Sequence, residues 1–195
     1  MTLEAWSTAA SIGTFVVIGT TAIVAIAQLR HLRSSNQIAI LTEVYETLES
    51  DEFTEARRYI AQELPKLLAT PQGLEKIAAP PPMPIELAPI RKLANFFENL
   101  GAFVKNGIID KSLACDLWNG VILDSWDQME AVVAVRRARR DNPGLWENFE
   151  YAAALAKEFQ ETYPGGTYPA GMRRMVFSQR TKDAVAAAMA LTHDR

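Results

Sequence analysis

Histidine and cysteine are almost missing from this sequence. It contains two histidines, His31 and His193, and one cysteine, Cys115. His31 follows directly on a long apolar run and His193 lies two residues before Arg195, so neither is well placed for a Ser-His-Asp or Cys-His site, and two histidines do not make a histidine-rich metal site. A single cysteine forms no internal disulfide, which fits a reducing compartment. Cys115 lies in an apolar stretch, which favours a small core residue over a nucleophile.

Nucleotide-binding motifs and an excess of positive charge are also absent. The sequence has no P-loop, no G-x-G-x-x-G and no Cys-x-x-Cys. Its 20 basic and 23 acidic residues give a formal net charge of -3, so no general basic field attracts nucleic acid. We therefore predict no catalytic residue set, no metal site, no cofactor and no nucleic-acid partner.

Alternating strand patterns and internal repeats are lacking as well. The hydrophobic fraction of 49% is ample for a core. Where apolar residues recur, they do so at helical spacing. The sequence therefore predicts an all-α protein.

The clearest positive feature is the apolar run from Ala5 to Leu29, which has no ionisable side chain. At about 1.5 Å per residue, such a run covers a hydrocarbon core of about 30 Å. Arg30, His31 and Arg33 follow at once, and basic residues at that flank tend to stay in the cytoplasm. The prediction is a transmembrane anchor with its basic flank over residues 1–33, with the N-terminus outside and the following domain cytoplasmic.

Two other interpretations of this run stay open, a cleaved signal peptide and a buried soluble helix. Ala25-Ile26-Ala27 has the form that signal peptidase accepts, but the preceding residues include Glu4 and no basic residue, and the run is longer than a signal peptide needs. Thr14, Thr20 and Thr21 give the helix a small polar face. These threonines either pair with another transmembrane helix or bond the carbonyls of their own helix.

Beyond the anchor, helical periodicity covers most of the chain. It is found over 38–48, 51–68, 85–106, 110–140 and 143–159. We expect Thr70-Pro71 to end the second of these helices and Pro143 to be the first helical residue of the last. The fold prediction is one N-terminal transmembrane helix continuing into a cytoplasmic bundle of about four to five helices.

Proline and glycine divide the remainder of the chain. Residues 78–84 are rich in proline and predict a strap, either a rigid connector or a ligand for an aromatic groove. The strap lies inside a helical domain over 34–163. Residues 164–195 predict a loop and a loosely attached tail, with a short helix near 181–191.

Two clusters are candidate sites. Asn95, Glu98 and Asn99 predict a partly buried polar site, and the alternative is a hydrogen bond that links helices. Arg136, Arg137, Arg139 and Arg140 suit lipid headgroups or other anions, and the alternative is that they complement the dipole at the end of a helix. Carboxylates three apart predict a solvated face more than a metal site; they are Asp124, Asp127 and Glu130.

Three segments carry a resemblance to a known family. They are Gln28-Leu29-Arg30-His31-Leu32-Arg33, then Asn95-Phe96-Phe97-Glu98 with Gly101 and Val104-Lys105, and Trp146-Glu147-Asn148-Phe149-Glu150-Tyr151. Over roughly residues 10–155 the chain resembles bacterial proteins of a domain-of-unknown-function family. The resemblance implies a short anchor in a bacterial inner membrane, followed by a cytoplasmic helical domain. It brings no established activity, and it excludes the strap and the tail.

The functional hypothesis is a single-pass, membrane-anchored helical protein that serves as a non-enzymatic interaction or regulatory module at the inner leaflet. Its expected partners are membrane lipids and either a second protein or another copy of this chain. Two alternatives come from other classes. One is a carboxylate-dependent hydrolase that uses Glu98 and its neighbours, and the other is a small oligomeric membrane effector that depends on Thr14 and Thr21.

Overall fold

The computed structural model describes the backbone of residues 3–193 and the side chains at 12–26, 28 and 37–190. Over this part of the chain every regular element is a helix, which confirms the all-α prediction. The chain divides into two compact units, Met1–Thr162 and Tyr163–Arg195.

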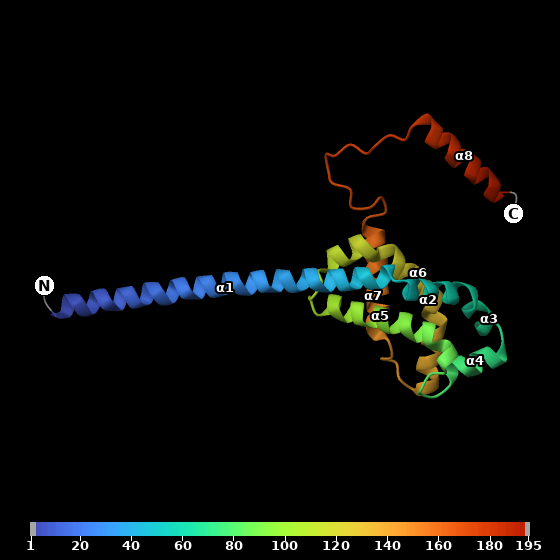
Figure 1. Cartoon of the computed structure of the whole chain (residues 1–195), viewed down its shortest axis with the longest axis horizontal. Helices are drawn as coiled ribbons and strands as arrows, with labels where there is room; N and C mark the ends of the chain where they lie inside the picture. The colour runs from blue at the N-terminus through green and yellow to red at the C-terminus, as the bar shows by residue number, and fades with distance from the viewer. Residues whose placement is uncertain (1–2, 194–195) are drawn as a thin grey trace. The chain divides into compact units, whose positions relative to one another are not determined.

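Figure 1 labels the helices of both units. In the described part of the chain these are α1 (Leu3–Glu49), α2 (Asp51–Gln62), α3 (Leu64–Leu68), α4 (Pro71–Ala78), the 3₁₀ helix η1 (Ile85–Leu87), α5 (Ala88–Lys105), α6 (Lys111–Arg140), α7 (Glu147–Thr162) and α8 (Gln179–His193). The expected count of about four to five matches the long helices α1, α2, α5, α6 and α7, and it missed the short α3 and α4.

Helix α1 is one uninterrupted helix whose C-terminal part belongs to the bundle (Figure 1). Val44 is buried there, and Ile40, Leu41 and Leu48 pack against the same core. The prediction that the N-terminal helix continues into the bundle is therefore confirmed.

In the N-terminal part of α1, the described side chains at 12–26 and 28 are exposed. Phe15 is 79% exposed and Ile23 is 70% exposed. None of the helices in the described part of the chain is both long enough and apolar enough to cross a membrane. Much of the anchor predicted over 1–33 lies outside the described side chains, as do Arg30, His31 and Arg33 of its basic flank. The anchor accordingly stays a prediction.

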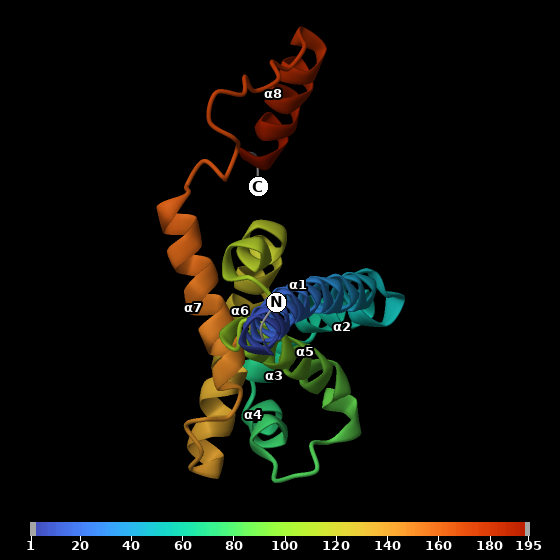
Figure 2. The ribbon, with the colours of Figure 1, turned by 90° about the vertical axis from the view of Figure 1, so that its left-hand side faces the viewer.

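The core of the first unit forms where α5, α6 and α7 meet. Figure 2 views α1 nearly end-on and shows α7 running past α6. The ring of Phe97 on α5 stacks on that of Phe149 on α7, with centroids 5.0 Å apart. Trp126 of α6 meets Phe149 edge-on at 5.1 Å. Large aromatic residues from three helices thus fill one seam, and such pairs stabilise a core beyond the area they bury.

The helix expected over 51–68 is in fact two helices. Helix α2 ends at Gln62 and α3 begins at Leu64, with Pro65 in its first turn. Proline has no backbone N–H to continue the α2 ladder, which accounts for the break. The expectation that Thr70-Pro71 only ends a helix was also incomplete. The Thr70 hydroxyl accepts a hydrogen bond from the N–H of Gly73 at 3.1 Å and so caps α4.

The start expected at Pro143 is wrong by four residues, because α7 begins at Glu147. Trp146 adopts a left-handed conformation with φ of 56°. Its side chain is buried, so the preceding residues turn inward instead of opening a helix. Burial of one large aromatic side chain outweighs the local preference of proline for a helix start.

The second unit consists of residues 163–178, without helix, followed by α8. Every described side chain of this unit is exposed. Helix α8 includes the short helix expected at 181–191.

Candidate functional site

The first candidate site is the half-buried carboxylate of Glu98 on α5. One of its oxygens accepts hydrogen bonds from the backbone N–H groups of Asn148 and Phe149, both at 3.0 Å. Its other oxygen accepts from the side-chain amide of Asn148 at 2.8 Å. The two N–H groups lie in the first turn of α7 and have no acceptor within that helix. Glu98 therefore caps α7 from a neighbouring helix, and its negative charge suits the helix N-terminus.

Other residues of α5 fix the same turn of α7. Asn95 accepts a hydrogen bond from the indole N–H of Trp146 at 3.1 Å. Lys105 bonds the side chains of Glu147 at 3.2 Å and Asn148 at 3.1 Å. Two of the segments that carry the sequence resemblance are thus docked on each other, and their polar residues specify that docking.

This geometry bears on the hydrolase alternative. Both oxygens of Glu98 are occupied by groups of the chain itself, and Glu98 lines none of three surface cavities on the bundle. Asn99 does not join the Glu98 network. It is exposed and lines a small groove between α1 and α5. The alternative of a hydrogen bond that links helices therefore describes Glu98, while Asn99 lies apart.

The arginine cluster at the end of α6 does not form one surface patch. Arg136 is 2% exposed, because it lies on the inward face of α6, one turn after Val132 and two turns after Met129. Its guanidinium donates to the carbonyl of Ile77 at 2.7 Å and lies over the ring of Trp146. Burial, with a smaller contribution from Arg140, lowers the pKa of Arg136.

The other three arginines differ in their surroundings. Arg137 donates to the carbonyl of Leu145 at 2.8 Å and to the Glu150 carboxylate at 2.7 Å, so it fastens the turn before α7. Arg139 and Arg140 are exposed. Only these last two are accessible to an anion in solution or to a headgroup.

The remaining sequence candidates lie on ordinary surfaces or in the core. Cys115 is buried, and burial followed by the nearby Asp110 raises the pKa of its thiol. Asp124, Asp127 and Glu130 are exposed on α6. Among the described residues, no group of three or more His, Cys, Asp or Glu side chains is placed to hold a metal ion.

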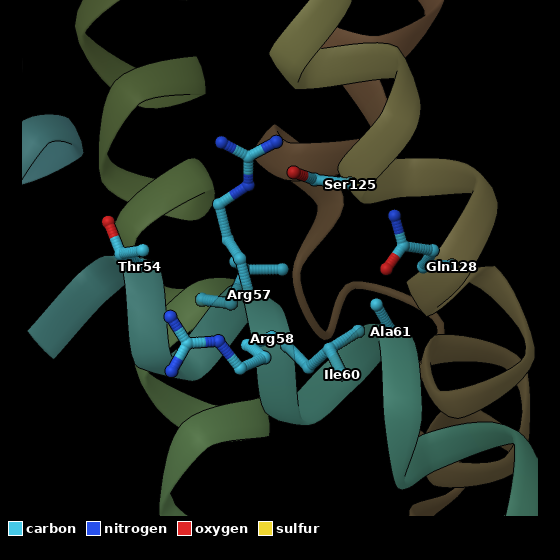
Figure 3. Close-up of a pocket in the computed structure, with 8 residues that line it drawn as sticks. Thr54, Arg57, Arg58, Ile60, Ala61, Ser125 and Gln128 are labelled. Atoms are coloured by element: carbon cyan, nitrogen blue, oxygen red, sulfur yellow. The ribbon is translucent and has the colours of Figure 1, made fainter.

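A cavity between α2 and α6 brings together polar residues that the sequence did not single out. Its volume is about 260 Å³, and its polar lining comes from Thr54, Arg57, Arg58, Ser125 and Gln128. Figure 3 shows the Arg57 guanidinium extending toward Ser125 and the Gln128 amide extending from α6 toward α2.

A weak sequence signal for this cavity existed. Thr54 and Arg57 are three apart and lie beside the inward stripe of α2. On α6, Ser125 is a polar residue within the inward stripe, and the exposed Gln128 is three residues further on. The spacing shows that each pair shares a helix face. It does not show that the two faces meet, since that depends on how the bundle packs.

Comparison with known proteins supports the sequence resemblance and corrects its extent, because the matched range includes the strap at 78–84. The search of curated proteins finds no match, and neither does the search of solved structures. One family model matches residues 15–155, from within α1 to within α7, and so includes both segments that dock around Glu98. This match confirms the resemblance to a domain-of-unknown-function family and carries no information on membrane or organism. Because it covers most of the chain, the protein belongs to the family described as "Domain of unknown function (DUF4760)".

Proposed function

We propose that this protein is a single-pass, membrane-anchored module of a bacterial inner membrane, with a non-enzymatic interaction or regulatory role at the cytoplasmic leaflet. The observation that carries the proposal is the exposed apolar part of α1, which continues without a break into the bundle.

The exposed apolar surface surrounds α1 on all sides. Phe15, Val16, Val17 and Ile18 are consecutive, so at 3.6 residues per turn they point in four directions around the helix. Their exposed fractions are 79%, 58%, 64% and 63%. A helix that is apolar all round is typical of a large protein core or of a lipid bilayer. No part of the described chain covers it, and a bilayer supplies an apolar surrounding on every side.

The polar groups of this segment also suit lipid. The hydroxyls of Thr20 and Thr21 donate to the carbonyls of Val16 and Val17, both at 2.8 Å. Hydroxyls satisfied within their own helix need no water or partner in a hydrocarbon core. Thr20 and Thr21 thus bond the carbonyls of their own helix and are not engaged with another helix of the described chain. The oligomeric effector hypothesis is therefore left without a specific observation in its favour.

The bundle lies at the end of α1 that follows Arg30, His31 and Arg33, and basic residues at this flank favour a cytoplasmic location. Arg139 and Arg140 are exposed cations at the end of α6 and are available for acidic headgroups. The interaction role would then require a cytoplasmic protein partner or a second copy of the chain.

The test uses the full chain with a C-terminal tag, expressed in a bacterial host. We expect membranes to retain it after an alkaline carbonate wash. We also expect protease to remove the tag in inverted vesicles and to leave it intact in spheroplasts. Ile18→Arg should lower retention, because an arginine in the middle of a span costs about 2.5–3.5 kcal/mol on insertion.

Leu117→Arg is the matched control, because it adds the same charge at a 55% exposed position of α6. Its retention should equal that of the original chain. Release of the original chain by carbonate would refute the anchor, and cleavage of the tag in spheroplasts would refute the topology.

A further inference from the structure

We propose that the cavity between α2 and α6 binds a small phosphate monoester. This proposal is independent of the membrane anchor, because every residue that carries it lies within the bundle.

The cavity has the size and the charge that a small anion needs. Its volume of about 260 Å³ corresponds to roughly nine water molecules at about 30 Å³ each. Two arginines line it, and no acidic residue does. Ile60 and Leu93 provide an apolar part of the wall, against which a short organic group can pack.

Arg57 is the principal candidate ligand. Neither Arg57 nor the neighbouring Arg58 takes part in an ion pair with any described residue. By contrast, Lys92 of α5 pairs with Glu52 of α2 in the same bundle. An arginine beside a cavity and without a carboxylate partner retains its full set of donors for an anion.

Two further donors face Arg57 from α6 (Figure 3). Ser125 is 3% exposed and lines the cavity, so its hydroxyl is a candidate donor to a ligand there. Gln128 donates one amide hydrogen to the carbonyl of Asp124 at 3.0 Å, so its second amide hydrogen remains available.

The arrangement of donors favours phosphate over carboxylate. The guanidinium of Arg57 approaches the cavity from α2, and the hydroxyl of Ser125 and the amide of Gln128 approach it from α6. A phosphate monoester presents three terminal oxygens, one for each donor group. A carboxylate has two oxygens in one plane, which a single guanidinium satisfies in a bidentate manner. Arg58, at the same cavity, adds positive charge.

The experiment measures ligand-dependent thermal stability and calorimetric binding of the full chain in a mild detergent. The probes are inorganic phosphate, glycerol phosphate and acetate. We expect a saturable rise of Tm with glycerol phosphate and with inorganic phosphate, and none with acetate. Arg57→Gln and Ser125→Ala should each weaken binding on the order of tenfold, the former more, because hydrogen bonds to charged groups are the stronger ones.

Arg180→Gln is the matched control, because it removes one exposed arginine from α8 and should leave binding unchanged. Variants that retain the Tm of the original chain without ligand separate lost binding from lost folding. The proposal is overturned if neither phosphate probe binds, if acetate binds equally well, or if Arg180→Gln weakens binding as much as Arg57→Gln. Binding to vesicles of acidic phospholipid without binding of glycerol phosphate would assign the arginines to a membrane surface and also overturn it.

Discussion

Replacement of Gly101 by alanine should destabilise this protein, although the same replacement inside most helices is favourable. Gly101 lies within α5, where α7 approaches it closely. A Cβ atom at this position would lie 1.9 Å from the carbonyl oxygen of Asn148 and 2.5 Å from its carbonyl carbon. Carbon and oxygen atoms in contact are ordinarily at least about 3.3 Å apart, so the helices must separate by roughly 1.4 Å.

The magnitude follows from two opposing effects. Alanine gains about 1 kcal/mol over glycine in a helix interior. Overpacking costs about 1–3 kcal/mol, and the displaced backbone also carries the N–H groups that Glu98 accepts from, each worth about 1.5–3 kcal/mol. We therefore expect a net loss of at least about 2 kcal/mol, or a decrease in Tm of roughly 4–8 °C for a chain of this length.

Gly120 provides the internal control. It lies within α6, and a Cβ atom added there would meet nothing within 4 Å. Gly120→Ala should raise the free energy of unfolding by about 1 kcal/mol, which is roughly 2–4 °C in Tm. Thermal unfolding of the full chain in detergent, followed by circular dichroism, measures both variants. If Gly101→Ala is as stable as Gly120→Ala, the close approach of α5 and α7 is wrong.

Three other predictions concern the buried polar groups. Glu98→Ala leaves the N–H groups of Asn148 and Phe149 without their acceptor and should lower the free energy of unfolding by about 2–4 kcal/mol. Glu98→Gln retains one acceptor oxygen and should lose less stability. Equal losses for the two variants in chemical denaturation would argue against the cap. Arg136→Ala should cost about 3–5 kcal/mol, since it empties a fully buried site and frees the Ile77 carbonyl, while Arg139→Ala at the exposed position should stay within about 0.5 kcal/mol. Burial and Asp110 raise the pKa of Cys115 in the folded chain, so the unfolded chain ionises first. The protonated thiol of Cys115 therefore contributes to the free energy of unfolding below the unfolded pKa of about 8.5, and this contribution is lost as the pH rises through the folded pKa. Cys115→Ala should remove that part of the pH dependence of stability, and a plot of stability against pH that is unchanged in the variant would contradict the reasoning.

Much of the fold was predictable because its long helices are strongly periodic. Asp110 caps α6 through the N–H of Leu113 at 3.0 Å, a short-range contact that the sequence order already implies. The start of α7 was not predictable in this way. Its cap comes from Glu98, about fifty residues earlier in the chain, and depends on where α5 lies.

The candidate sites show the same division between local and tertiary information. Composition placed Arg136, Arg137, Arg139 and Arg140 in one cluster, yet the helical period turns Arg136 into the core and leaves Arg139 outside. Reading that period through the last turn of α6 would have separated them. The meeting of Arg57 with Ser125 requires the packing of α2 on α6, which no local pattern specifies.

The uninterrupted course of α1 means that the apolar segment and the bundle share one helical phase. From Thr20 to Glu49 the helix contains no glycine or proline, the residues at which helices most often kink. Whatever holds the apolar segment therefore also sets the azimuth of the bundle about the helix axis. One residue inserted between Gln28 and Gln37 would turn the bundle by about 100° and advance it by about 1.5 Å, while seven inserted residues would nearly restore the azimuth. A rotation of the apolar segment about the helix axis would therefore turn the bundle through the same angle.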